Sequence, residues 1–362
     1  MKERVTNWAE RFIRLPAVGL DISDRSIKYV KFSARRRIRF EFFGEAEIPE
    51  GVIRDGQIER EEELSAIIRR LATEEGRDFG SGGAVVSMPE EKSFLRLVQL
   101  SKVKPAEVRG ALRWQIEGQI PLAPDDIAYD FEVIEPLADR LDHLDAVVTA
   151  FPRRIVDSYV RVLKQAGLHP SALELESQAI VRAAIREVSS RDAKIIIDMG
   201  RYRTSFVIFA GGTIIFTATQ PVGGRVFEAE IVKTLGVAGE EAMRIKKEIG
   251  LSKDAYEGKV FAALLPPLAE LARELGRAIA YYQDHVNHIH GASERIALVL
   301  LSGGDANLYG LDTFLASQIR IPVQIADPFS VIGERLEYVV PPIPRNQALA
   351  FTAAIGLAMR GL

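Results

Sequence analysis

The chain has 362 residues, of which 47% are hydrophobic and 27% charged, the balance of a globular protein with two domains of ordinary size. It contains no cysteine, which excludes disulfides, thiolate zinc sites and a cysteine nucleophile. The net charge of -3 at pH 7 gives no basic surface for nucleic acid, and the longest apolar runs, such as 296–301, have the length of a strand rather than of a membrane-spanning helix.

Residues 1–15 form an amphipathic segment without the apolar core and cleavage site of a secretory signal. Apolar residues recur there at helical spacing, with basic residues at the other positions: Val5, Trp8, Phe12 and Leu15 against Lys2, Arg4, Arg11 and Arg14. Two interpretations remain open, a short helix that lies on anionic lipid and a helix that packs on the protein's own first strand.

Apolar periodicity, glycines and prolines predict the remaining elements in chain order. In the first part we expect strands within 18–53, a helix near 60–75, strands at 84–87 and 94–100, a helix over 105–119, strands near 127–134 and 145–150, and helices over 153–166 and 174–188. A second part begins with a strand at 195 and ends with a helix at 308–318, a strand at 323–325 and a helix at 347–359. Both parts open with the same pattern of strand, turn and strand, which indicates a duplicated α/β unit with a ligand crevice between the copies.

Each of the two repeated turns carries an aspartate at the end of an apolar strand. The first reads Leu20-Asp21-Ile22-Ser23-Asp24-Arg25-Ser26, and the second reads Ile197-Asp198-Met199-Gly200-Arg201-Tyr202-Arg203-Thr204. The apolar runs on either side predict antiparallel hairpins. Two such hairpins facing each other would clamp a polyphosphate, with backbone N–H and hydroxyl groups on the phosphates and the aspartates on Mg²⁺ or its water shell.

A third loop follows the apolar run 296–301 and reads Ser302-Gly303-Gly304-Asp305. The glycines allow a flat ring or a phosphate to approach the backbone, and the start of a helix favours an anion. Each of the three loops alone is also ordinary turn chemistry. Their order and separation make a nucleotide site the stronger interpretation.

Taken together, these loops resemble those of the actin-like ATPase superfamily and, within it, the FtsA/PilM family. Further motifs carry the resemblance: Pro221-Val222-Gly223-Gly224, Glu240-Glu241-Ala242 with Lys246, Ala353-Ala354-Ile355-Gly356 and Trp114-Gln115-Ile116-Glu117. The resemblance implies an α/β, actin-like ATPase fold with two duplicated ribonuclease H-like domains and a small inserted α/β subdomain. The implied boundaries are 16–87, 171–193 and 345–362 for the first domain, 88–170 for the inserted subdomain, and 194–344 for the second domain, with 236–295 as its helical subdomain.

The resemblance also implies ATP and Mg²⁺ as cofactors. Asp21 and Asp198 would hold the metal and act in catalysis, with Glu176 as the residue that orients water, chosen among Glu174, Glu176 and Gln178. The implied nucleotide contacts are Ser23, Ser26, Lys28, Gly200, Thr204, Gly223, Gly224, Lys246, Gly303 and Gly304.

Two departures from the family pattern bear on turnover. Asp24 stands in a turn that usually reads Gly-Ser-Ser, where its charge would repel phosphate unless Arg25 or Mg²⁺ compensates. Met243 stands where the family has a glutamate on the ribose hydroxyls, and a thioether cannot replace those hydrogen bonds. We therefore expect nucleotide binding with weak or absent hydrolysis.

The family resemblance implies a cytoplasmic scaffold, peripheral to the inner membrane, in the assembly platform of a type IV pilus or a related type II secretion system. Its partners would be the N-terminal tail of a PilN-like membrane protein and other platform proteins, and the tail would bind between the inserted subdomain and the first domain. Arg113 and Gln115 on the helix after Pro105 are the candidate contacts. Trp114 and Leu112 either join that surface or lie in the subdomain's own core.

Two alternative functions remain, and one further metal site was considered. A polymerising protein of the division type would carry a C-terminal amphipathic helix, which the sequence ending Met359-Arg360-Gly361-Leu362 does not resemble. A sugar kinase of the same superfamily would need a catalytic aspartate in the first half, for which Asp125, Asp126 and Asp130 are the candidates. His285, His288 and His290 suggest a zinc site only weakly, because Asp284 alone is near enough to complete one.

Overall fold

A computed structural model describes residues 16–34, 37–74, 77, 79, 83–134, 142–187, 191–285, 293, 295–337 and 340–362. The amphipathic segment 1–15 and the histidines at 288 and 290 lie outside these described residues.

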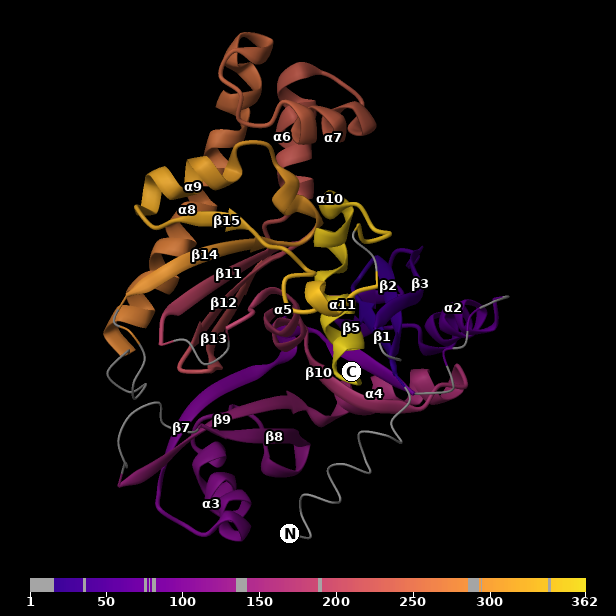
Figure 1. The fold of residues 1–362 in the computed structure, drawn as a ribbon, viewed down its shortest axis with the longest axis vertical. Helices are drawn as coiled ribbons and strands as arrows, with labels where there is room; N and C mark the ends of the chain where they lie inside the picture. Colours follow the sequence, from indigo (N-terminus) through magenta and orange to yellow (C-terminus); the bar gives the residue numbers. More distant parts are fainter. Residues whose placement is uncertain are drawn as a thin grey trace.

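Two five-stranded sheets with the same topology form the two halves of the molecule (Figure 1). The first has the order β10-β6-β1-β2-β3 and consists of β1 (Val18–Ile22), β2 (Ser26–Ala34), β3 (Ile38–Glu47), β6 (Ala84–Met88) and β10 (Pro170–Leu175). The second has the order β13-β12-β11-β14-β15 and consists of β11 (Ala193–Met199), β12 (Thr204–Ala210), β13 (Thr213–Gln220), β14 (Ile296–Ser302) and β15 (Val323–Ile325). In each sheet three antiparallel strands precede two parallel ones, so the predicted duplication is confirmed.

A third, smaller sheet lies below the other two in Figure 1 and forms a separate α/β unit with one helix. It has the order β7-β9-β8 and consists of β7 (Phe94–Ser101), β8 (Ile127–Ile134) and β9 (His143–Pro152), all antiparallel, with α3 (Pro105–Glu117) against one face. Val108, Leu112 and Ile116 repeat every four residues on α3 and are buried in this unit's own core.

Helices cover the sheets and separate them. In the described part of the chain the other α-helices are α2 (Glu61–Thr73), α4 (Arg153–Gln165), α5 (Glu176–Ala184), α6 (Gly224–Leu235), α7 (Gly239–Glu248), α8 (Lys259–His285), α9 (Leu311–Ile319), α10 (Arg345–Ala348) and α11 (Thr352–Met359). Helices α5 and α11 lie between the two large sheets, while α6, α8 and α9 cover the other side of the second (Figure 1).

The second sheet therefore has two apolar faces, and β11 reads as a continuous β-branched run. Ile196 shares a core cluster with Ile180 of α5 and Ala353 of α11, whereas Ile195 and Ile197 belong to the cluster formed with α6 and α8. Since side chains alternate along a strand, one run of isoleucines supplies both clusters.

Backbone contact between α11, α5 and β1 depends on two glycines. A Cβ atom at Gly356 of α11 would lie 1.8 Å from the Ala179 carbonyl oxygen of α5, and one at Gly19 of β1 would lie 2.4 Å from the Ala354 carbonyl oxygen. The helices can therefore approach the strand, and each other, only where no side chain intervenes.

The main departure from the expected elements concerns 174–188, which we predicted as a single helix. Glu174 and Leu175 instead end β10, and α5 begins at Glu176. The helix expected at 347–359 is also interrupted, because residues 349–351 form a short 3-10 turn between α10 and α11.

We expect Gly356→Ala to lower the free energy of unfolding by about 3 kcal/mol, because the added methyl overlaps a main-chain atom that cannot move away. Gly110→Ala is the matched control, since Gly110 is an exposed glycine of α3 with open space around it. That change should raise stability by about 1 kcal/mol through helix propensity alone. Urea unfolding of both variants measures the difference, and equal effects would contradict the close approach.

Candidate functional site

A cavity of about 790 Å³ lies between the two halves and is lined by the ends of β1 and β11. Three separate loops line it. The first hairpin contributes Asp21, Ser23, Ser26 and Lys28, the second contributes Asp198 and Gly200, and the loop after β14 contributes Gly303 and Gly304. Glu176, from the start of α5, and Met243 of α7 also line the cavity.

Hydrogen bonds within the first hairpin hold its turn in one conformation. The Ser23 amide donates to the Ser26 carbonyl oxygen at 2.9 Å, and the Ser26 amide donates to Ser23 Oγ at 3.1 Å. Asp21 lies beside this turn at the end of β1, where Ser87 Oγ from β6 donates to its Oδ1 at 2.9 Å. Opposite Asp21 in the strand register, Lys28 donates through Nζ to Ser26 Oγ at 3.2 Å.

The second hairpin is supported from below by the start of α6. Gly200 closes the turn by donating to the Arg203 carbonyl oxygen at 2.9 Å, and its own carbonyl oxygen accepts from Gly224 at 3.0 Å. Gly223 is required here because a Cβ atom would lie 2.5 Å from the Gly200 carbonyl oxygen. Thr204 is buried and donates through Oγ1 to the Val222 carbonyl oxygen at 2.6 Å, so it holds the loop rather than lining the cavity.

Lys246 likewise supports the site from behind. It is 1% exposed, it does not line the cavity, and its Nζ donates to Glu228 at 2.7 Å and to Asp305. Asp305 packs against Gly224, where a Cβ atom would lie 2.0 Å from its carboxyl carbon. The buried ammonium therefore joins α6, α7 and the loop after β14, with its charge compensated by two carboxylates.

Asp21, Asp198 and Glu176 line the cavity and have raised pKa values. Burial raises the pKa of Asp198 to about 6, and the charge of Asp21 adds to this. Burial also raises the pKa of Asp21, opposed by Lys28 and by the hydrogen bond from Ser87. Burial, followed by the charges of Asp21 and Asp198, raises the pKa of Glu176 well above its ordinary value. A cation bound among them would relieve this repulsion.

Of the three residues considered for orienting water, only Glu176 lines the cavity. Glu174 is buried and accepts from Arg182 Nη2 at 2.8 Å and from Arg360, so it joins β10, α5 and the C-terminal residues. Gln178 accepts the Leu175 amide at 3.2 Å and so caps the start of α5. The latter two have structural partners.

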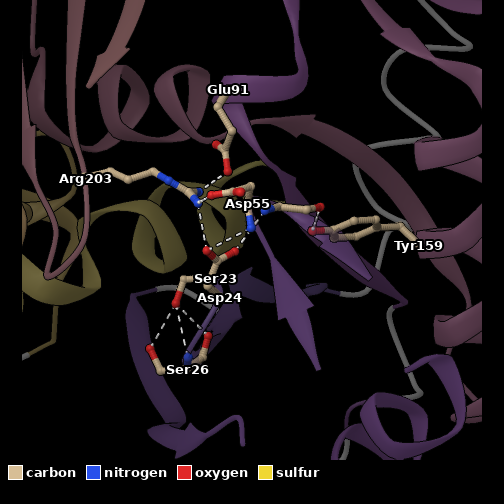
Figure 2. A network of polar contacts seen from close by, with 8 residues as sticks. Ser23, Asp24, Ser26, Asp55, Glu91, Tyr159 and Arg203 are labelled. Atoms are coloured by element: carbon tan, nitrogen blue, oxygen red, sulfur yellow. Dashed lines mark hydrogen bonds and ion pairs between the residues drawn. The ribbon is translucent and has the colours of Figure 1, made fainter. Parts of the chain in front are cut away.

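Arg203 binds three carboxylates that come from three different segments of the chain (Figure 2). Its Nη2 lies 2.7 Å from Asp24 of the first hairpin and 3.0 Å from Asp55, and its Nη1 donates to Glu91. Asp24 also accepts the backbone amides of Gly56 at 2.9 Å and Asp55 at 3.1 Å. The charge of Asp24 is therefore compensated by Arg203, whereas Arg25, which the sequence suggested, pairs with Glu50 at 3.2 Å.

The turn η1 (Glu90–Lys92) lies next to this cluster and leads directly into β7. Glu90 is buried and accepts the Ser177 amide at 3.2 Å and Ser177 Oγ at 3.1 Å, so it caps the start of α5 beside Glu176. Burial raises the pKa of Glu90 to about 7. Because Leu175 at the N-cap has no polar side chain, this carboxylate from a distant segment supplies the cap.

Sequence reasoning missed Ser87, Glu90 and Arg203. Ser87 had a local indication, a polar residue inside an otherwise apolar strand. Arg203 stood within the second turn, but its partner Asp24 is 179 residues away, so nothing local indicated the pair.

The proposed partner-binding residues lie on α3, away from the large cavity. Arg113 lines a smaller cavity of about 190 Å³ with Arg153 at the start of α4, while Gln115 is exposed and lies outside it. Trp114 is 77% exposed, whereas Leu112 is fully buried, so only Leu112 joins the subdomain's own core.

The other candidate sites gain no support among the described residues. Asp125, Asp126 and Asp130 do not line the large cavity, and no cluster of three potential metal ligands is present in the described part of the chain. No helix among the described residues is long and apolar enough to cross a bilayer.

Residues 19–362 match the family model described as Type IV pilus assembly protein PilM. The chain belongs to this family. The structure of this chain is similar to a solved structure described as a PilM-PilN type IV pilus biogenesis complex. The TM-score is 0.77 and the sequence identity 23%, over 96% of this chain and 99% of that one. The actin-like ATPase fold predicted from the sequence is therefore confirmed.

The chain is also similar to a cell division protein and to a solved structure of MreB5. The cell division protein FtsA of Bacillus subtilis is 27% identical over 220 residues, 56% of this chain and 50% of FtsA, so the match spans about half the length of that relative. MreB5 of Spiroplasma citri, in a structure bound to AMPPNP, has TM-score 0.55 and 13% identity over 95% of each chain.

The raised pKa of Asp198 predicts a pH-dependent stability for the protein without nucleotide or metal. The folded state keeps a proton up to about pH 6 that the unfolded carboxyl loses near 3.8, so stability falls as the pH rises through this window. Asp198→Asn has no carboxyl proton to lose there, so its stability should not fall in this window. The difference in Tm between Asp198→Asn and wild type should therefore increase by about 2–5 °C between pH 5 and pH 7.5. The exposed Asp157→Asn of α4 is the control, and a pH-independent difference for Asp198→Asn would contradict the assignment.

Proposed function

We propose that this protein is a cytoplasmic ATP-binding scaffold of the inner-membrane assembly platform of a type IV pilus or a related secretion system. It would bind the N-terminal tail of a PilN-like membrane protein. The observation that carries the proposal is that Asp21 and Asp198, from two duplicated hairpins, line one cavity in a chain of the PilM family.

The cavity fits a nucleoside triphosphate in size and in the loops that line it. Turn amides and the Ser23 and Ser26 hydroxyls are available to phosphate oxygens, and Gly303 and Gly304 leave room for a flat group at the other side. The AMPPNP in the MreB5 structure supports a nucleotide as the ligand of this fold. Four of the predicted nucleotide contacts would instead hold the loops in place without touching the nucleotide: Gly223, Gly224, Thr204 and Lys246.

The charges of the lining favour a nucleotide that arrives with Mg²⁺. Seven carboxylates line the cavity, namely Asp21, Asp24, Glu45, Glu47, Glu91, Glu176 and Asp198, against four cations, namely Arg25, Lys28, Arg201 and Arg203. A triphosphate alone would be repelled by this excess. Asp21 and Asp198 are hard oxygen donors of the kind that Mg²⁺ accepts directly or through its waters, and the ion would neutralise phosphate charge.

We propose that hydrolysis is slow, with turnover below about 1 s⁻¹, the low end of ordinary enzymes. Glu176 is the candidate to orient the attacking water, but burial and the charges of Asp21 and Asp198 raise its pKa, so it more readily keeps a proton of its own, which makes it a poor proton acceptor. Met243 lines the cavity where the family resemblance implies a ribose-binding glutamate. A nucleotide that is hydrolysed slowly would act by fixing the conformation in which this protein binds its partners.

We further propose the division into a first domain of 16–87, 171–193 and 345–362, an inserted subdomain of 88–170 and a second domain of 194–344. The tail of the membrane partner would bind between the inserted subdomain and the first domain, near the cavity that Arg113 and Arg153 line. The PilM-PilN complex, whose description pairs such a protein with PilN, supports this choice of partner.

A glutamate at position 243, where the family resemblance implies one that binds the ribose hydroxyls, should tighten nucleotide binding. Met243→Glu is expected to lower the Kd for Mg-ATP by about 5-fold, the equivalent of one net hydrogen bond of about 1 kcal/mol. Met243→Leu is the control, and 2′,3′-dideoxy-ATP should bind both variants equally. Isothermal titration measures the affinities, and a gain that persists with the dideoxy nucleotide would count against ribose contact.

Changes of charge or size at exposed positions of α3 should weaken binding of the partner's tail. We expect Arg113→Glu and Gln115→Trp to raise the Kd for a PilN-like N-terminal peptide by roughly 10-fold, with Tm near wild type because both side chains are exposed. Lys164→Glu, on the exposed face of α4, is the control. Fluorescence anisotropy with the labelled peptide gives the affinities, and unchanged binding in both α3 variants would place the tail elsewhere.

A further inference from the structure

Each of the two aspartates in the cavity has a serine beside it on the neighbouring parallel strand. In the first sheet, Asp21 of β1 accepts a hydrogen bond from Ser87 of β6, and the two strands are parallel. In the second sheet, Asp198 of β11 is the register partner of Ser302, the last residue of β14, and these strands are also parallel. The duplication therefore includes a serine on the adjacent strand as well as the hairpins themselves.

Both serines lie on the side of their sheet that faces the other half of the molecule. Ile196, two residues before Asp198, shares a core cluster with residues of α5 and α11. Val85, two residues before Ser87, shares another cluster with the same two helices. Since side chains alternate between the faces of a sheet and register partners share a face, each aspartate and its serine point to the side where α5 and α11 lie.

The hydroxyl of Ser87 is fixed by two hydrogen bonds. Its Oγ accepts the Ile22 amide at 3.0 Å and donates to Asp21 Oδ1 at 2.9 Å, and the side chain is 2% exposed. Hydrogen bonds of this kind orient carboxylates that bind metals. The Asp21 side chain is therefore held in place by the protein alone.

The hydroxyl of Ser302 differs, because it lacks such bonds. Ser302 is fully buried, yet its Oγ completes no hydrogen bond with the residues that the structure describes. Burial raises the pKa of Asp198, and the Ser302 hydroxyl partly offsets this rise, so the hydroxyl lies close to that carboxyl. A buried hydroxyl without a partner costs free energy, which a small rotation of the Asp198 carboxyl toward it would recover.

We propose that Ser87 and Ser302 are positioning residues for the two aspartates and that they act in different states of the protein. Ser87 holds Asp21 before the ligand arrives, whereas Ser302 donates to Asp198 only when the magnesium nucleotide is bound. The inference rests on the proposed function, in which both aspartates bind Mg²⁺ or its waters. The second half of the site is then completed by the ligand itself.

Removing each hydroxyl should therefore affect different measurements. Ser87→Ala is expected to lower the Tm of the nucleotide-free protein, because the Ile22 amide and Asp21 lose their partner. Ser302→Ala should leave that Tm at or above the wild-type value, because no completed bond is lost. Both variants should raise the Kd for Mg-ATP by about 10-fold in isothermal titration. Ser87→Thr and Ser302→Thr keep the hydroxyl and should recover most of the affinity.

The matched control is Ser158→Ala in α4. Ser158 is also buried, and its Oγ donates to the Ile155 carbonyl oxygen at 2.8 Å, but it lies outside the cavity. This change should leave the Kd for Mg-ATP unchanged. With Mn²⁺ in place of Mg²⁺, the electron paramagnetic resonance lines of the bound metal should broaden in Ser87→Ala and Ser302→Ala and not in the control, since only the aspartates of the first two are held less firmly.

Three outcomes would overturn the inference. Equal Kd values for wild type, Ser87→Ala and Ser302→Ala would show that the serines position nothing, while the proposed function would stand. A Ser302→Ala variant that loses as much Tm without nucleotide as Ser87→Ala would contradict the difference in state. Failure of the wild type to bind Mg-ATP would overturn the proposed function and this inference with it.

Discussion

The guanidinium of Arg203 is the contact on which the geometry of the cavity most depends. It lies between Asp24 of the first hairpin, Asp55 of the neighbouring turn and Glu91 at the start of the small sheet, and its side chain is 23% exposed. One cation therefore joins three segments that would otherwise repel one another. In this partly buried setting the loss of the cation would leave its anionic partners unpaired, which costs more than the pairs themselves contribute.

The same principle, anions held by a limited number of cations, explains the rest of the lining. Lys28 neutralises the end of the first hairpin and Lys246 neutralises Glu228 and Asp305 beneath the third loop, but Asp198 and Glu176 keep raised pKa values. The protein thus supplies loop geometry in advance and leaves part of its charge uncompensated. A metal-bound polyphosphate suits such a cavity because the metal brings the missing positive charge.

The parts of this structure that the sequence predicted are those determined locally. The two hairpins with Asp21 and Asp198 follow from apolar runs and turn residues, whereas the sequence left Leu112 open between the partner surface and the core, where the structure buries it. The end of strand β10 was predicted as helix because the polar Glu174 fits a helical period equally well. The ion pairs of Glu174 with Arg182 and Arg360 explain why a glutamate is buried in this strand. Lys246 matched a sequence motif, yet the structure gives it two carboxylate partners outside the cavity. Motif reading assigns residue types to a region, whereas the partners of each charge depend on segments far apart in the chain.

The turn Glu90–Lys92 brings the site and the small sheet into one mechanical unit. Glu90 caps α5 next to Glu176, Glu91 holds Arg203 of the second hairpin, and β7 begins at Phe94. Any movement of the two halves that separates Arg203 from Glu91 must therefore either break that ion pair or displace the start of β7. Since β7 also packs against β13, the cavity and the small sheet are joined through a turn of three residues. The position of the small sheet thus depends on the same charges that shape the cavity, and the state of one is linked to the state of the other through this turn.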